Sequence, residues 1–284
     1  MSFSTVTVIG AGTMGHGIAH VAALAGAQVR LYDLQQPALD KGLSAIQANM
    51  DKGVARGKLA AEDAQAGLAR IQGFTDLAGA CEGTELVVEA VPEKLELKQS
   101  LFSQVQGLVS ADCVLGTNTS SLSIAKIAQA VEQGDRVIGL HFFNPVHIMK
   151  LLEIVVHPGT SEDTLARCRA WGAQIGKECI TVQDFPGFAT SRLGVCLGME
   201  AIRMVEQGVA SPQDIDTAMV LGYRHPIGPL KLTDLVGLDV RMHIGEYLAE
   251  KLDNPAFKPP QLMKDMVAQG KLGKKAGQGF YDWE

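Results

Sequence analysis

The stretch Thr5-Val-Thr-Val-Ile9 leads directly into Gly10-Ala-Gly-Thr-Met-Gly15 and decides how the first part of the chain folds. Its β-branched residues predict a short strand that ends in a tight, glycine-rich turn. An apolar pattern of helical period follows from about Thr13 to Ala25, and Gln28-Val-Arg-Leu-Tyr32 predicts a second strand. Strand, glycine-rich turn, helix and strand in this order are typical of a doubly wound α/β domain.

The glycine-rich turn has the spacing of a dinucleotide-binding loop. Gly10 permits the turn, Gly12 lets the backbone approach a pyrophosphate, and Gly15 allows the helix to pack closely on the strand. Thr13 and Met14 begin the helix, whose N-terminus attracts the pyrophosphate. A lone motif of this kind is weak evidence. Here the preceding strand, the following helix, a second strand and a terminal acid all occur together.

The terminal acid is Asp33, which ends the second strand about twenty residues beyond the glycines. Its carboxylate would accept hydrogen bonds from the adenosine ribose and would repel a 2′-phosphate, so the chain is expected to bind NAD rather than NADP. His16 and His20 lie one turn apart on the intervening helix, which is a metal-ligand spacing. They lack the accompanying glutamate of a zinc hydrolase helix, and no metal site is expected.

The whole chain has the composition of an ordinary globular protein. Of its 284 residues, 46% are apolar and 20% are charged, and this length favours two domains. The net charge of −6 provides no basic field for nucleic acid. No apolar run reaches the ~18 residues of a membrane span, and the first residues lack the features of a signal or transit peptide. Five scattered cysteines without a C-x-x-C pair are typical of a reducing compartment, so a cytoplasmic protein is expected.

The alternation of strand and helix patterns continues as far as Asp184 and then stops. Beyond it, patterns of helical period occupy residues 188–205, 211–220, 230–236, 239–252 and 260–267. We therefore expect an α/β Rossmann-type NAD-binding domain at residues 1–185 and an all-α C-terminal domain at residues 186–284.

Polar residues follow two of the strands expected in the first domain. Glu93 comes after the strand at 84–91, and Asn118 and Ser120 come after the strand at 114–117. Helix capping explains one of these side chains. Doubly wound sheets bind ligands at the carboxyl ends of their strands, so a role in substrate binding is the functional alternative.

Two apolar runs, 137–142 and 151–156, are separated by the turn signal Asn144-Pro145. The chain is expected to reverse there, so that the runs lie side by side. His141 ends the first run and Glu153 lies inside the second. A buried carboxylate costs several kcal/mol unless it is paired, which favours an ion pair with the imidazole and a general base working near pH 7. The alternative is two buried strands whose polar residue is satisfied by backbone.

Lys52, Arg56 and Lys58 form a basic cluster in a chain that is acidic overall. A solvated helix face would explain them. The functional alternative is a landing site for an extended, phosphorylated ligand such as a CoA tail. The glycine-rich tail, residues 270–283, also carries lysines; it is either an ordered loop or a segment that brings a lysine to the cofactor.

Several stretches together resemble the L-3-hydroxyacyl-CoA dehydrogenase family, and most of all its single-function members, which include bacterial 3-hydroxybutyryl-CoA dehydrogenases. They occur in family order along nearly the whole chain: VIGAGTMG from Val8, VVEAVPEKLELK from Val87, NTSSL from Asn118, HFFNP from His141, PGF from Pro186, HPIGPL from His225 and GKKAGQGFY from Gly273. The resemblance implies NAD-dependent oxidation of a short-chain L-3-hydroxyacyl-CoA to the 3-ketoacyl-CoA, or the reverse reduction. It also implies a homodimer that assembles through the helical domain.

The resemblance assigns roles to residues of this chain. His141 would be the catalytic base, Glu153 would orient it, and Ser120 would hydrogen-bond substrate and cofactor. Besides the glycine-rich turn and Asp33, the positions expected to contact NAD are Glu93, Lys98, Asn118, Ser120, Asn144 and Lys275. Those expected to contact the acyl-CoA are Ser120, Asn144, Asn49, Lys52 and Arg56.

One departure from the family pattern concerns the active site. After Pro-Gly-Phe the family usually has Val-Asn-Arg, whereas this chain has Ala189-Thr-Ser-Arg192. Ser191 then stands in place of the asparagine and offers one hydroxyl instead of an amide. His147 is a second departure, because the family often has a proline or small residue there. It is expected either to read substrate polarity or to lie at the surface of the turn.

Two rival functions remain open on the sequence alone. One is a dehydrogenase of the same superfamily that acts on a free hydroxy acid, such as a sugar acid or carnitine, without CoA. The presence of Ser191 in place of asparagine favours this alternative function, whereas the basic cluster, a candidate CoA site, argues against it. The other is a catalytically inactive, NAD-binding structural protein, which the presence of His141, Glu153, Ser120 and the glycine-rich turn opposes.

Overall fold

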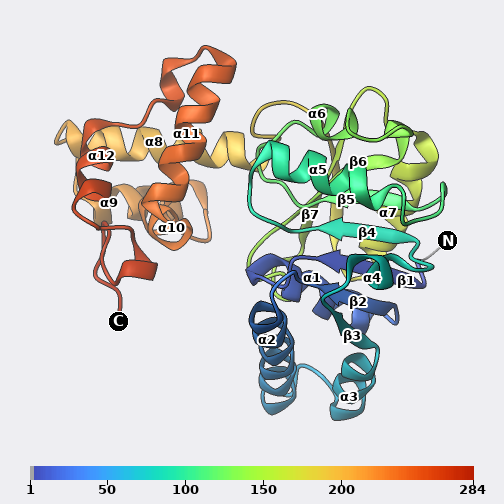
Figure 1. Ribbon diagram of the computed structural model, residues 1–284. Helices are drawn as coiled ribbons and strands as arrows, with labels where there is room; N and C mark the ends of the chain where they lie inside the picture. Colours follow the sequence, from blue (N-terminus) through green and yellow to red (C-terminus); the bar gives the residue numbers. More distant parts are fainter. Residues whose placement is uncertain (1–2) are drawn as a thin grey trace. The chain divides into compact units, whose positions relative to one another are not determined.

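The computed structural model describes residues 3–284 and divides the chain into two compact units (Figure 1). The first unit extends to Asp184 and the second runs from Phe185 to Glu284. The fold class expected from the sequence is confirmed: the first unit is a sheet with flanking helices and the second is helical.

The first unit is built on an eight-stranded sheet of order β3-β2-β1-β4-β5-β6-β7-β8. All neighbouring strands pair in parallel except β6 and β7, which are antiparallel. The strands are β1 (Thr5–Ile9), β2 (Gln28–Tyr32), β3 (Ile71–Phe74), β4 (Leu86–Glu89), β5 (Val114–Thr117), β6 (Val137–Phe142), β7 (Leu151–Val156) and β8 (Glu178–Gln183). The strand order reverses between β1 and β4, where doubly wound sheets bind their ligands.

Helices of the first unit connect these strands. They are α1 (Thr13–Leu24), α2 (Gln36–Ala55), α3 (Ala61–Ala69), α4 (Leu77–Cys81), α5 (Leu95–Val105), α6 (Ile124–Ala128), the short η1 (Gly134–Arg136) and α7 (Glu162–Gln174). Ile18 of α1, Ile46 of α2 and Trp171 of α7 share one core cluster with the inward-facing residues of the sheet. Burial of these large apolar side chains fixes the helices on the sheet.

The second unit packs its helices around a separate core. Its elements are α8 (Thr190–Glu206), α9 (Pro212–Thr217), the π-helical η2 (Ala218–Gly222), α10 (Pro229–Val236), α11 (Leu238–Leu252), η3 (Pro255–Phe257), α12 (Gln261–Ala268) and η4 (Lys274–Ala276). Met199, Ile202, Leu230 and Leu248 are fully buried in this core. Buried Asp234 accepts hydrogen bonds from the backbone N–H groups of residues 280 and 281 and from the indole of Trp283, which fixes the C-terminal tail.

Two details of the first unit concern the segment between β2 and β4. Residues 36–69 contain two helices, α2 and α3, and the chain turns between them at Gly57, whose φ is +63°. The sequence patterns do not predict β3 and α4, which are short and follow directly after α3.

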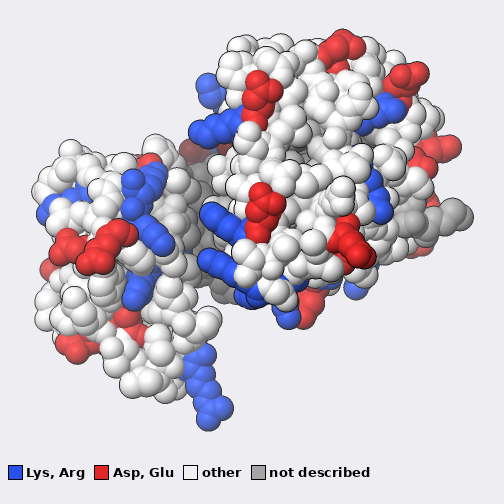
Figure 2. Space-filling model, turned by 90° about the horizontal axis from the view of Figure 1, so that it is seen from below, with Lys and Arg blue, Asp and Glu red and all other residues white. Residues whose placement is uncertain are grey.

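The surface carries charges of both signs. On the face drawn in Figure 2, basic and acidic side chains are interspersed, as the small net charge of −6 leads one to expect. Among residues 3–284, no helix is both long and apolar enough to cross a membrane.

Candidate active site

Only glycine fits at two positions, Gly10 and Gly15, of the turn between β1 and α1. Gly10 has φ +100°, and a Cβ there would lie 2.8 Å from the carbonyl oxygen of Ala90. A Cβ on Gly15 would lie 1.7 Å from the carbonyl oxygen of Gly10. Gly12 differs, since no described atom lies within 4 Å of its added Cβ. The turn is therefore tight on the protein side and open at Gly12, where a ligand would approach.

The N-terminus of α1 suits a pyrophosphate. In the described part of the chain no side chain caps this helix, and no acid lies in its first turn. Asp33 accepts hydrogen bonds from the backbone N–H groups of Ala11 (2.9 Å) and Gln35 (3.0 Å). These bonds fix the carboxylate at the end of β2, beside the turn. The helix N-terminus and the adjacent carboxylate fit the pyrophosphate and ribose of NAD.

His141 and Glu153 face one another across the antiparallel pair β6–β7. They are register partners, and their side chains are joined by a 2.7 Å contact between Nδ1 and Oε2. Glu153 is fully buried and His141 is 7% exposed. The expected pairing of these side chains is confirmed. A carboxylate that accepts from Nδ1–H fixes the ring tautomer, so that Nε2 is the nitrogen suited to take a substrate proton.

Glu153→Gln is expected to lower kcat about 10- to 10³-fold, since the amide cannot stabilise an imidazolium as a carboxylate does. The affinity for NADH should stay nearly unchanged, because Glu153 lies in the hairpin and not at the glycine-rich turn. Steady-state kinetics and fluorescence titration with NADH measure the two effects. Loss of NADH binding would instead indicate a structural role for this carboxylate.

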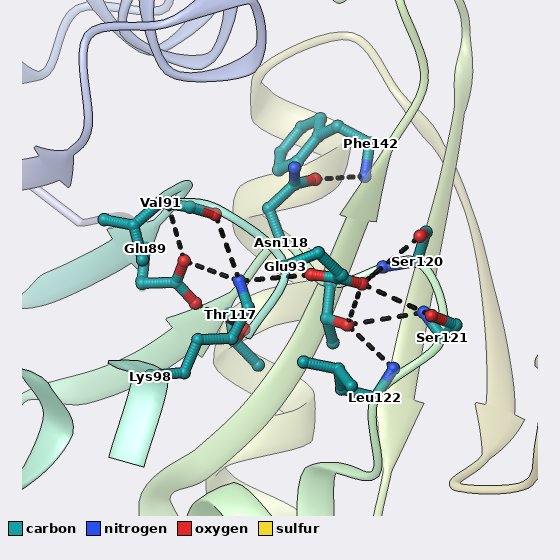
Figure 3. A network of polar contacts seen from close by, with 11 residues as sticks. Glu89, Val91, Glu93, Lys98, Thr117, Asn118, Ser120, Ser121, Leu122 and Phe142 are labelled. Carbon is teal, nitrogen blue, oxygen red and sulfur yellow. Dashed lines mark hydrogen bonds and ion pairs between the residues drawn. The ribbon is translucent and has the colours of Figure 1, made fainter. Parts of the chain in front are cut away.

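Lys98 and Glu89 form a buried ion pair at the carboxyl end of β4, beside the end of β5 (Figure 3). Lys98 of α5 and Glu89 of β4 are both fully buried, with 2.6 Å between Nζ and Oε1. Glu89 also accepts hydrogen bonds from the N–H of Val91 and the hydroxyl of Thr117. Lys98 further contacts Glu93 at 3.4 Å. The pair links the strand ends to the segment that carries Glu93.

Glu93 organises the polar segment after β5. Its Oε1 accepts from the hydroxyl of Thr119 (2.6 Å) and from the backbone N–H (2.9 Å) and hydroxyl (3.3 Å) of Ser120 (Figure 3). Asn118 accepts a hydrogen bond from the backbone N–H of Phe142, the residue after His141. The structure thus brings Asn118, Ser120 and Glu93 together at the strand ends, next to β6, the strand that carries His141.

Glu89, Thr117 and Thr119 are absent from the residues predicted from sequence. Glu89 carried a usable signal, because a carboxylate in the apolar strand Leu86–Glu89 requires a partner just as Glu153 does. The hydroxyls of Thr117 and Thr119 have no such signal, since threonine is common in strands and turns.

The residues of the basic cluster are exposed and line a cavity. Asn49, Lys52, Arg56 and Lys58 line a cavity of about 600 Å³, together with residues of α1, the segment after β6 and the segment before β8. His147 also lines this cavity and stacks on His20, with ring centroids 5.2 Å apart. The cavity is large enough for a nucleotide-sized group.

Three further predicted residues belong to other segments of the chain. Asn144 is exposed in the segment between β6 and β7. Ser191 lies in the first turn of α8, and Lys275 contacts Asp239 at 2.7 Å, both within the second unit. Their contacts with substrate or cofactor remain predictions.

The comparisons with known proteins cover both units. Residues 5–185 match the family model described as "3-hydroxyacyl-CoA dehydrogenase, NAD binding domain", and residues 187–283 match "3-hydroxyacyl-CoA dehydrogenase, C-terminal domain". The chain belongs to the 3-hydroxyacyl-CoA dehydrogenase family. The resemblance seen in the sequence is thereby confirmed.

Similar proteins in this family span the full chain. A probable 3-hydroxybutyryl-CoA dehydrogenase of Bacillus subtilis is 39% identical over 284 residues, which is 100% of this chain and 99% of the relative. The mitochondrial hydroxyacyl-coenzyme A dehydrogenase of Sus scrofa is 43% identical over 98% of this chain and 91% of its own. The crystal structure of (S)-3-hydroxybutyryl-CoA dehydrogenase from Ralstonia eutropha has a TM-score of 0.95 at 40% identity and covers both chains fully. This member of the family is therefore an NAD-dependent oxidoreductase.

Proposed function

We propose that this dehydrogenase oxidises short-chain L-3-hydroxyacyl-CoA to 3-ketoacyl-CoA with NAD and catalyses the reverse reduction. The observation that carries the proposal is the buried His141–Glu153 pair, 2.7 Å apart, in a sheet whose glycine-rich turn fits NAD. The names of the full-length relatives favour a CoA thioester over a free hydroxy acid and over an inactive protein.

The residues of the hairpin perform the proton transfer. His141 takes the proton of the substrate 3-hydroxyl through Nε2, and Glu153 stabilises the imidazolium that forms. The glycine-rich turn and Asp33 would hold NAD, which would supply the hydride acceptor for C3 of the substrate. In the reverse direction His141 returns the proton to the carbonyl oxygen.

Ser120 positions the substrate for the reaction. Its hydroxyl and its N–H both donate to Glu93, which fixes the serine at the end of β5, where its oxygen would accept a hydrogen bond from the substrate. Asn144, and Ser191 and Lys275 of the second unit, are proposed as further contacts on the family resemblance alone.

The cavity lined by Lys52, Arg56 and Lys58 would hold the phosphorylated tail of CoA. Its basic side chains lie in a chain with a net charge of −6, so the positive potential there is local. Asn49 lines the same cavity and offers an amide to the ligand.

A steady-state panel tests the proposed function. Acetoacetyl-CoA, longer 3-ketoacyl-CoA thioesters and free 3-keto acids are assayed with NADH and with NADPH. We expect the highest kcat/KM for a short thioester with NADH. Activity on free 3-keto acids with none on thioesters would overturn the proposal.

Asp33→Ser is expected to improve use of NADPH relative to NADH by about tenfold or more, because it removes a carboxylate that repels the 2′-phosphate. The serine hydroxyl still bonds a ribose hydroxyl, so activity with NADH should fall only moderately. The ratio of kcat/KM values for the two cofactors measures this. If the unaltered enzyme had a higher kcat/KM with NADPH than with NADH, the role of Asp33 in selecting NAD would be contradicted.

We also propose a cytoplasmic homodimer that assembles through the helical unit. That unit exposes the apolar side chains of Leu193 (72%), Leu221 (76%) and Tyr223 (76%), which a second copy would cover. Size-exclusion chromatography with light scattering should give twice the chain mass of 30.2 kDa. A monomer at micromolar concentration would contradict this.

A further inference from the structure

Two histidines, His20 and His147, line the cavity beside α1 and α2, and one ring nitrogen of His20 has no hydrogen-bond partner among the described residues. His20 and His147 stack with their ring planes only 2° from parallel. His20 is 3% exposed, and its Nδ1 has no hydrogen-bond partner among the described residues. A buried nitrogen of this kind is costly to leave unpaired, and it lies in a ring that lines the cavity.

The lining of the cavity is basic. Among its described residues there is no aspartate or glutamate, and its cations are Lys52, Arg56, Lys58, Lys150 and Lys177. Lys177 donates hydrogen bonds to the carbonyl oxygens of Val146 (2.5 Å) and Met149 (2.7 Å). These bonds fix the ammonium and hold the segment that carries His147. The cavity therefore suits an anion whose phosphates meet fixed positive charges.

The imidazoles themselves are neutral near pH 7. Burial, together with the neighbouring His147, His16 and Lys177, lowers the pKa of His20 to about 4. Burial also lowers the pKa of His147, with His16, Lys177 and Lys52 acting in the same direction. The stack thus offers a flat aromatic surface and neutral ring nitrogens among cations. Such a surface matches a purine ring that carries phosphates.

We propose that His147 and His20 determine specificity for the nucleotide end of the thioester, the exposed ring of His147 stacking on the adenine while the cations bind the phosphates. The sequence left His147 undecided between reading the substrate and lying at the surface of the turn. The stack and the cavity favour the first. This inference rests on the proposed CoA substrate and names residues that read it.

The test compares two substrates with the same acyl group, acetoacetyl-CoA and the N-acetylcysteamine thioester of acetoacetate, which lacks the nucleotide. For His147→Ala we expect KM for acetoacetyl-CoA to rise about tenfold with kcat unchanged, because one stacking contact is lost. KM for the truncated thioester should stay the same. His147→Phe keeps a flat ring and should retain most of the affinity for acetoacetyl-CoA.

Direct binding gives a second measurement. Adenosine 3′,5′-bisphosphate should inhibit competitively against acetoacetyl-CoA, and His147→Ala should weaken it about tenfold. Inhibition by inorganic pyrophosphate, which has no base to stack, should not change. His243→Ala is the matched control, since His243 is an exposed histidine of α11 whose Nδ1 bonds only its own helix carbonyl at Asp239.

Two outcomes would overturn the inference. One is an equal change of KM for both thioesters, which a general structural effect would cause. The other is an unchanged KM for acetoacetyl-CoA in His147→Ala. In either case turnover of the truncated thioester still reports on the dehydrogenase reaction, so failure of this inference is distinguishable from failure of the proposed function.

Discussion

His141→Gln is expected to reduce kcat for the reduction of acetoacetyl-CoA by about 10²–10⁴-fold, the usual contribution of a positioned general acid or base. Glutamine keeps a polar side chain near Glu153 but cannot exchange a proton at neutral pH. His141 is buried and meets Glu153 at 2.7 Å, so water does not readily take its place. Stopped-flow or steady-state absorbance of NADH measures the loss.

The affinity for NADH is the internal control for this variant. It should remain within a factor of about two, since His141 lies in β6 and the glycine-rich turn lies between β1 and α1. His243→Gln, a histidine substitution in the helical unit, should leave turnover unchanged. Survival of acetoacetyl-CoA reduction within tenfold in His141→Gln would show that another group is the base.

Lys98→Met is expected to lower the free energy of unfolding by about 3–5 kcal/mol. The substitution leaves the carboxylate of Glu89 fully buried without its ionic partner. Val91 and Thr117 still donate hydrogen bonds to this carboxylate, but they bring no charge. Urea denaturation followed by circular dichroism measures the change.

Two further variants show whether the uncompensated charge is the cause. Glu89→Gln combined with Lys98→Met removes both charges and should recover much of the lost stability. Lys94→Met removes an exposed lysine at the N-cap of α5 and should change stability by less than about 0.5 kcal/mol. A loss of less than about 1 kcal/mol in Lys98→Met would mean that the Glu89–Lys98 pair contributes little.

The fold was largely predictable because its signals are local. The glycine spacing, the acid at the end of β2 and the end of the α/β pattern at Asp184 are all read within short windows. Strand β3 was not predictable in this way. Its sequence, Ile-Gln-Gly-Phe, has no clear alternation, and its place in the sheet depends on parallel pairing with β2 alone.

The site was predictable where a residue conflicts with its surroundings. Glu153 lies in an apolar run, so a partner had to exist, and His141 was at hand across the turn. Lys98 carries no such signal within a helix, where lysine is an ordinary surface residue. Its complete burial follows from the position of α5 on the sheet, which is a property of the tertiary structure.

The stacking of His20 on His147 was not predictable from the sequence, because it also depends on the tertiary structure. The two residues are far apart along the chain, and their meeting requires the segment after β6 to lie against α1. The hydrogen bonds from Lys177 to Val146 and Met149 hold that segment, and Lys177 itself comes from the turn before β8.

The antiparallel pairing of β6 and β7 has a consequence for how this enzyme can vary. An insertion of one residue between Leu151 and Glu153 would turn Glu153 toward the opposite face of the sheet and abolish the pair. An insertion in residues 143–150 would be absorbed by the connecting segment and leave the register of the strands intact. The same segment lines the cavity that we assign to the nucleotide. Substrate recognition is thus free to diverge by changes in loop length and sequence, while the proton-transfer geometry is inherited unchanged.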